Sequence, residues 1–209
     1  MAKIVIIDSG SGGLNVLNEC KKLLPKEEFI YYADTPNSPY GDKKQKELKR
    51  IAKSLVEKFS LEYDPDIFVL ACNTLTTNTI AFLRKSFPDK KFVGTEPALK
   101  PALKKYKKKD ILLFATHATI KKCKIRGIKK LYIKNLPKLI DDNLDELYSL
   151  NPILIKYLLK NKYKNIKAIV LGCTHFIYLK NNINIILGDN IEFFDNTKGV
   201  AKRVKSLLN

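Results

Sequence analysis

The amino-acid sequence predicts an α/β fold with two pseudo-symmetric parallel-sheet domains and an active site in the cleft between them. Short apolar runs rich in β-branched residues alternate with longer amphipathic stretches along the 209 residues. That alternation is typical of parallel sheets covered by helices. One strand-and-turn pattern also occurs twice, about a hundred residues apart, which indicates two related halves.

Eight apolar runs have the length and composition of buried strands. Most hold several Ile, Val, Leu or Phe residues and are followed by small or polar residues that favour a turn. The expected strands are Ile4 to Ile7, Phe29 to Ala33, Ile67 to Ala71, Lys91 to Gly94, Ile111 to Ala115, Lys129 to Ile133, Ala168 to Leu171 and Ile191 to Phe194. We expect helices in most of the gaps between them.

Two of these gaps show apolar residues at helical spacing. The first stripe follows Gly12 and Gly13, and the second lies between residues 48 and 59. Their members are Leu14, Leu17, Leu23 and Leu24, then Leu48, Ile51, Ala52, Leu55, Val56 and Phe59. Such stripes predict helix faces that pack on a core, not functional sites. A last helix, from Lys198 to Leu208, is expected to return to the first half.

The repeated pattern indicates how the two halves are organised. The segment Ile67 to Thr74 reads IFVLACNT, and Ala168 to His175 reads AIVLGCTH. Each half would place its polar turns at the carboxyl ends of its strands, where open α/β sheets bind ligands. We expect a first domain of residues 1–95 plus about 186–209 and a second domain of residues 96–185, with a crossing near Gly94 to Pro97.

The cysteines and the N-terminus indicate the compartment. Four cysteines are too few for a disulfide scaffold, and none has metal-ligand spacing with the two histidines. We therefore expect free thiols in a reducing cytoplasm and no metal. The chain begins Met-Ala-Lys and enters an apolar strand at once, so we expect no secretory leader. No apolar run is long enough to cross a bilayer, and we expect no membrane partner.

The net charge of +18 and the pI near 9.6 raise the question of nucleic acid. Only four of the 39 basic residues are arginine, the side chain that makes bidentate contacts to bases and phosphates. The lysine excess looks spread along the chain, with Lys43–Lys44 and Lys104 to Lys109 as solvated helix ends and loops. Nucleic acid is therefore not expected as the main partner. A basic nucleic-acid-binding protein with a vestigial site is the alternative from a different class.

Two of the four cysteines stand where thiol chemistry is favoured. Cys72 and Cys173 each follow a buried strand and precede an expected helix, whose N-terminus lowers the pKa of a nearby thiol. Asn73, Thr74 and Thr174 follow at once and are neutral donors suited to a carboxylate. Hydrophobic packing does not explain why polar residues follow these two cysteines directly, so we favour a functional role for both cysteines. For Cys20 and Cys123, as for His117, a structural role is expected.

Five motifs now carry a resemblance that spans most of the chain. They are Asp8-Ser-Gly-Ser-Gly-Gly-Leu14, Asp34 through Pro39-Tyr-Gly41, Ala71-Cys-Asn-Thr74, Gly94-Thr-Glu-Pro-Ala-Leu-Lys-Pro-Ala102 and Leu171-Gly-Cys-Thr-His175. Any one of them is weak evidence alone. In this combination and order they resemble the glutamate racemases of the aspartate/glutamate racemase superfamily.

The resemblance implies an isomerase that interconverts L- and D-glutamate without a cofactor, for peptidoglycan, and that forms a homodimer. It implies that Cys72 and Cys173 act as acid and base on opposite faces of the α-carbon. Asp8 and His175 resemble the residues that adjust the protonation of these thiols. The residues that resemble the substrate-lining positions are Ser9, Pro39, Tyr40, Gly41, Asn73, Thr74 and Thr174, together with Thr116 and Thr119 of the second domain.

The chemistry explains the need for two thiols. A proton α to an ionised carboxylate is scarcely acidic, and no lysine lies in a motif that would form a Schiff base with pyridoxal phosphate. Inversion also requires a proton to leave one face and another to arrive on the opposite face. Each auxiliary residue has a structural alternative: Asp8 as the cap of a turn and His175 as a hydrogen-bonded helix-start histidine.

The chain departs from the family in two places. Only 34 residues follow His175, whereas the family continues for longer, so we expect part of the first domain to be trimmed. Between Asn135 and Asp142 the family has a proline followed shortly by a glutamate, and Asp141 is the candidate here. A racemase of aspartate or of broader specificity is the nearest rival, because pocket shape sets the length of the side chain accepted. The motifs Pro39 to Gly41 and Gly172 to His175 favour glutamate.

Overall fold

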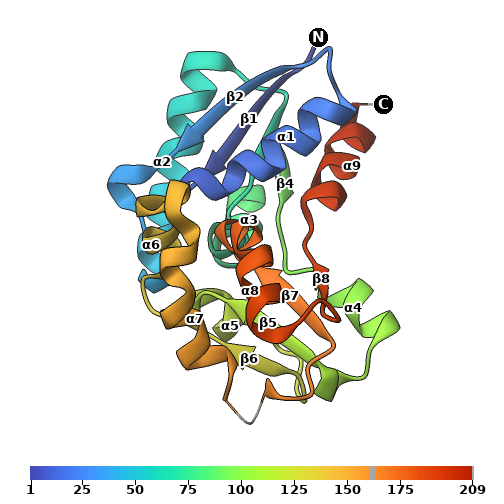
Figure 1. Cartoon of the computed structure of the whole chain (residues 1–209). Coiled ribbons are helices and arrows are strands. Elements are labelled where there is room, and N and C mark those ends of the chain that lie inside the picture. Colours follow the sequence, from blue (N-terminus) through green and yellow to red (C-terminus); the bar gives the residue numbers. More distant parts are fainter. Residues whose placement is uncertain (161–162, 209) are drawn as a thin grey trace.

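The computed structural model describes residues 1–160 and 163–208 and contains two four-stranded parallel sheets (Figure 1). The strand order is β2-β1-β3-β4 in the first sheet and β6-β5-β7-β8 in the second. The two halves therefore use their strands in the same sequence order. This topology confirms the α/β fold and the internal duplication expected from the sequence.

The first half places helices on both faces of its sheet. Its strands are β1 (Lys3–Asp8), β2 (Glu28–Ala33), β3 (Ile67–Leu70) and β4 (Lys91–Gly94), and its main helices are α1 (Leu14–Leu23), α2 (Gln45–Tyr63) and α3 (Asn73–Ser86). The stripe on α2 is buried at all six expected positions. On α1 the buried face is formed by Val16, Leu17 and Cys20, whereas Leu14 lies exposed at the first turn.

The second half repeats this plan with shorter helices. Its strands are β5 (Ile111–Ala115), β6 (Lys129–Leu131), β7 (Ala168–Gly172) and β8 (Glu192–Phe194). Its helices are α4 (Leu99–Lys105), α5 (His117–Lys122), α6 (Leu136–Asp142), α7 (Asn151–Leu158) and α8 (Lys180–Leu187), with 3-10 segments η5 (Leu144–Leu150) and η7 (Thr174–Leu179). Separate apolar clusters pack on the two faces of each sheet.

The chain crosses between the halves twice. It leaves the first half after β4, where the sequence predicts a crossing, and it returns after β8 to form α9 (Thr197–Leu208), which packs on α1 (Figure 1). β8 pairs with β7, so residues 192–194 complete the second sheet instead of joining the first domain from about residue 186. We propose the division 1–95 plus 195–208 for the first domain and 96–194 for the second.

The parallel register brings the turns of each sheet to one edge. Ile7 pairs with Leu70 in the first sheet, so the turn after β1 lies beside the turn that carries Cys72. Ala115 pairs with Gly172 in the second sheet, which brings Thr116 beside Cys173. Among the described residues, no helix is both long and apolar enough to span a bilayer.

Candidate active site

The carboxyl edges of the two sheets enclose a small cavity between the halves. It is lined by Ser9, Pro39, Tyr40, Gly41, Cys72, Asn73, Thr74, Thr116, Pro137 and Cys173. Its volume is about 10 Å³ when measured as the space open to the centre of a water molecule, which is room for roughly one water. Both thiols therefore face one enclosed space, and nine of the ten lining residues were expected from the sequence.

Cys72 stands directly before α3 in extended conformation and is 6% exposed. Its Sγ lies 4.0 Å from the Ser9 hydroxyl. Burial and the carboxylate of Asp8 raise the pKa of the Cys72 thiol, although the backbone N–H groups of Thr74 and Leu75 act in the opposite direction. The expectation of a lowered pKa for this thiol is therefore wrong in this closed arrangement, because burial outweighs the helix N-terminus.

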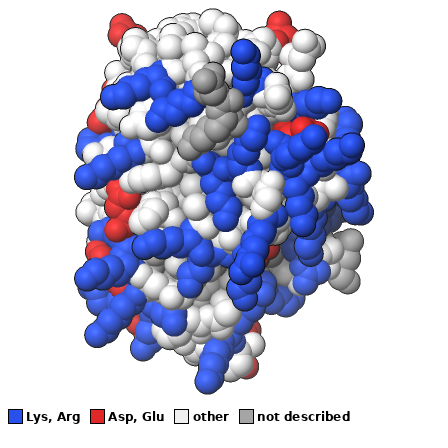
Figure 2. All heavy atoms as spheres, turned by 90° about the horizontal axis from the view of Figure 1, so that it is seen from below, with Lys and Arg blue, Asp and Glu red and all other residues white. Residues whose placement is uncertain are grey.

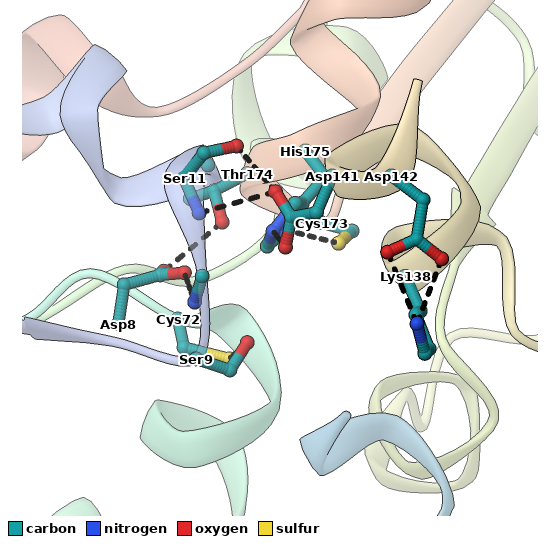
Figure 3. Close-up of polar contacts among 12 residues, drawn as sticks. Asp8, Ser9, Ser11, Cys72, Lys138, Asp141, Asp142, Cys173, Thr174 and His175 are labelled. Carbon is teal, nitrogen blue, oxygen red and sulfur yellow. Dashed lines mark hydrogen bonds and ion pairs between the residues drawn. The ribbon is translucent and has the colours of Figure 1, made fainter. Parts of the chain in front are cut away.

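Asp8 lies outside the cavity lining and is completely buried where the halves meet. One oxygen accepts a hydrogen bond from the Gly10 N–H at 3.0 Å, and the other accepts one from the Thr174 hydroxyl of the second half at 3.1 Å (Figure 3). Burial raises the pKa of Asp8, although the nearby His175 opposes this rise. A buried carboxyl group with a raised pKa thus lies on the Cys72 side of the site.

Cys173 begins a chain of contacts that ends in the other half. Its Sγ lies 3.8 Å from Nδ1 of His175, and His175 Nε2 lies 3.0 Å from an Asp141 carboxylate oxygen (Figure 3). The second oxygen of Asp141 accepts hydrogen bonds from the backbone N–H and the hydroxyl of Ser11. Asp141 therefore binds the histidine of its own half and the glycine-rich turn of the other.

The ionisation states of His175 and Asp141 depend on one another. Burial alone would lower the pKa of His175, but the hydrogen bond to Asp141 and the nearby Cys173 raise it well above its usual range. Burial alone would raise the pKa of Asp141, yet its bonds to His175 and Ser11 lower it. The pair is thus an imidazolium and a carboxylate at neutral pH, and the imidazolium faces the sulfur of Cys173.

Hydroxyl groups from both halves form a cluster at the cavity wall. The Thr74 hydroxyl lies 2.7 Å from that of Thr116 and 3.3 Å from that of Thr119. Thr116 also caps α5, since its side chain accepts the Thr119 N–H. Asn73 is fixed by donating to the Thr95 carbonyl at 3.1 Å. The Tyr40 hydroxyl donates to Asp34, which orients the tyrosine ring at the cavity wall.

Two glycines allow the halves to approach this closely. A Cβ atom on Gly12 would lie 2.5 Å from the His175 backbone nitrogen and 2.6 Å from the Thr174 hydroxyl. A Cβ on Gly10 would collide with the carboxylate of Asp141. The glycines of the first turn thus serve the contact between the halves as well as the turn itself.

The structure brings together the residues that the sequence singled out. Thr119, His175 and Asp141 lie outside the lining, one or two polar contacts from a lining residue. Asp8 and Thr174 also lie outside it and are hydrogen-bonded to each other. Sequence reasoning missed Pro137, Ser11 and Asp34 as members of the site. Cys20 lies in the core of the first half, Cys123 is half-buried, and His117 is exposed against the Tyr132 ring. In the described part of the chain, no three His, Cys, Asp or Glu side chains gather as a metal site would require.

Comparison with known proteins finds relatives along nearly the whole chain. No protein-family model matches the chain. The chain is 37% identical to a glutamate racemase of Clostridium novyi, in an alignment that covers 98% of this chain and 83% of that protein. It is also 37% identical to a glutamate racemase of Halothermothrix orenii, over 99% of this chain and 85% of that one.

A solved structure shares the two-domain fold. The crystal structure of Escherichia coli glutamate racemase in complex with L-glutamate and the activator UDP-MurNAc-Ala superposes with a TM-score of 0.86. The two proteins are 29% identical, and the match covers 99% of this chain and 82% of that chain.

Proposed function

Since this chain belongs to the glutamate racemase family, we propose that it interconverts L- and D-glutamate by proton transfer between Cys72 and Cys173. The observation that carries the mechanism is that both thiols line one enclosed cavity between the halves. A substrate held there presents its α-carbon to one sulfur on each face. One thiolate removes the α-proton while the opposite thiol delivers another, so the centre inverts.

The two thiols differ in their surroundings. An imidazolium at 3.8 Å attracts negative charge to the sulfur of Cys173, whereas Cys72 is held as a neutral thiol by its raised pKa. This combination is set for a proton to leave towards Cys173 and to arrive from Cys72. For the reverse reaction, Asp8 is the group placed to accept a proton on the Cys72 side.

Without a cofactor, the protein itself must supply the hydrogen-bond donors that bind the substrate carboxylates. Ser9, Asn73, Thr74 and Thr116 line the cavity with hydroxyl and amide groups that stabilise developing negative charge. The cavity has room for about one water, so glutamate enters only after the halves separate. Opening is expected at the two connections, residues 95–98 and 195–196.

The remaining parts of the proposal follow from the family. We propose glutamate over aspartate on the motifs Pro39 to Gly41 and Gly172 to His175, with pocket shape deciding the preference. The activity would supply D-glutamate for peptidoglycan in the cytoplasm. We propose a homodimer as the working form.

Replacement of either thiol tests the mechanism. Cys72→Ser and Cys173→Ser are each expected to lower the rate of racemisation in both directions by at least about 100-fold, because a serine hydroxyl is far less acidic than a thiol. Rotation of polarised light by each glutamate enantiomer measures the rate, with both aspartate enantiomers tested alongside. Cys123→Ser, outside the cavity, is the matched control and should retain the wild-type rate. A serine variant at 72 or 173 with near wild-type activity excludes that cysteine from the mechanism.

A further inference from the structure

The positive charge of this chain is unevenly distributed. Residues 1–95 contain 15 Lys and Arg against 12 Asp and Glu, whereas residues 96–209 contain 24 against 9. The expectation that the lysine excess is spread along the chain is therefore wrong. The excess lies in the second half and in α9, so its arrangement in space has to be explained.

Four segments of the second half form what we call the basic face: residues 104–109, 124–130, 156–160 and 164–167. They contain 13 Lys and Arg and no Asp or Glu. Residues 104–109 and 164–167 lie just before β5 and β7, residues 124–130 run into the start of β6, and residues 156–160 end α7. Because the strands are parallel, these segments gather at the amino edge of the second sheet. Figure 2 views the molecule from this end and shows many Lys and Arg spread among uncharged residues, with fewer Asp and Glu.

The charges of the basic face are largely uncompensated. Eleven of its basic residues are exposed, and Lys129 and Lys130 are half-buried. Among the described residues, Lys105 is the one member of this face in an ion pair, with Glu192. Like charges held together raise the local potential, and a polyanionic surface relieves that repulsion.

Two features favour a lipid surface as the partner. Twelve of the thirteen basic residues are lysine, whose compact charge is attracted to anionic headgroups without needing bidentate geometry. Leu159 is 58% exposed and Ile155 is 44% exposed, one helical turn apart at the end of α7 and beside Lys156 and Lys160. Aliphatic side chains next to lysines are typical of surfaces that enter the headgroup region.

The same face lacks what single-stranded nucleic acid requires. Bases stack on exposed aromatic rings. The tyrosines that the structure describes in this face, Tyr106 and Tyr157, are half-buried: Tyr106 donates to Glu192, and Lys160 lies over the ring of Tyr157. We therefore propose that the basic face binds the surface of an anionic lipid membrane, with Ile155 and Leu159 contacting the boundary of the acyl chains.

A membrane bound at the basic face would leave the cleft between the halves accessible. The cavity lies at the carboxyl edge of the second sheet, and the basic face lies at its amino edge. A membrane-bound molecule would therefore still open its cleft to the solvent. The proposal replaces the expectation of no membrane partner, which rested on the lack of an apolar run long enough to cross a bilayer, and it does not depend on the proposed reaction.

Sedimentation with lipid vesicles tests the proposal. The protein is expected to bind vesicles of equal parts phosphatidylglycerol and phosphatidylcholine at about 50 mM salt, to be released at about 500 mM, and not to bind phosphatidylcholine alone. The triple variant K107E/K109E/K124E should lower the partition coefficient at least about tenfold. The control K21E/K26E/K85E has the same net charge but lies on the first half, and it should stay within about twofold of wild type.

A second variant separates lipid from other polyanions. Leu159→Ser should weaken vesicle binding about threefold while leaving binding to duplex DNA unchanged. The midpoint of thermal unfolding, unchanged in all variants, shows that they are folded. No binding of the wild type to anionic vesicles at low salt, equal loss in both triple variants, or binding of DNA at a salt concentration that releases vesicles would each overturn the proposal.

Discussion

Asp141 is the residue that sets the charge of His175. Burial disfavours an imidazolium, and the carboxylate at 3.0 Å reverses that effect. Asp141 is itself held by Ser11 of the opposite half. The proton on His175, and with it the charge beside Cys173, therefore depends on contact between the two halves.

Asp141→Asn is expected to move the alkaline limb of the pH–rate profile to lower pH. The raised pKa keeps His175 protonated above its ordinary value of 6.5, and an amide cannot supply the charge that raises it. Activity should fall about 10- to 100-fold near neutral pH and recover partly at lower pH. The profile of kcat against pH in both directions measures the shift.

The neighbouring carboxylate provides a matched control. Asp142 binds Lys138 at the surface and does not contact His175 (Figure 3). Asp142→Asn should leave the profile in place. Equal profiles for wild type and Asp141→Asn would show that this carboxylate does not govern the histidine.

At the residue scale, the sequence predicted which residues form the site better than it predicted their pKa values. The two cysteines and their polar neighbours were predictable because strand ends and motif order are visible in one chain. Ser11 was missed because its partner, Asp141, is brought near only by tertiary contact, which no local spacing reveals. Asp34 stood in one of the quoted motifs, but its bond to the cavity residue Tyr40 is seen only in the structure. The raised pKa of Cys72 was missed for the same reason, since burial and the approach of Asp8 exist only in the folded molecule.

At the scale of elements, the first turn and η7 form the contact that joins the halves. The 3-10 segment η1 (Ser11–Gly13) packs directly on η7, which follows Cys173. The Tyr178 hydroxyl, also in η7, donates to the Ser11 carbonyl. The distance between the two cysteine turns is thus fixed by two short segments, not by the sheets alone.

Gly12→Ala should disrupt this contact. The added methyl group would lie 2.5 Å from the His175 backbone nitrogen, so the halves must move apart. A displacement of about 1 Å between catalytic groups costs roughly 100-fold in rate, and kcat should fall accordingly. Gly188→Ala is the control: its φ of 86° makes it a strained substitution, but nothing lies within 4 Å. It should lower thermal stability and leave kcat unchanged, and a Gly12→Ala enzyme with normal kcat would refute the argument.

The elements themselves were largely predictable. All eight strands occur where the apolar runs predict them. The central strands β1, β3, β5 and β7 are buried on both faces, as the middle of a parallel sheet requires, whereas the edge strands are largely half-buried. The sheet to which β8 belongs was not predictable from its own residues. That choice depends on the open edge of β7, which the pairing of Ile169 with Phe193 closes.

At the scale of the whole molecule, the two halves face one another across the cavity, and the second sheet has a different proposed function at each of its two edges. The carboxyl edges carry the thiols and enclose the cavity. The amino edge of the second half carries the basic face. The duplication was predictable from the sequence. The grouping of lysines on one face was not, because the segments that carry them are separated along the chain and meet only in the folded molecule.

The central claim is that two thiols of facing halves act on opposite sides of one carbon. It is tested most directly by starting the reaction with one glutamate enantiomer in D2O and following deuterium at the α-carbon of substrate and product. We expect product that carries deuterium from the first turnover while the remaining substrate stays protonated, because the arriving proton comes from a thiol exchanged with solvent. Product that retains the substrate proton, or equal deuteration of both enantiomers at early times, would contradict the two-thiol arrangement.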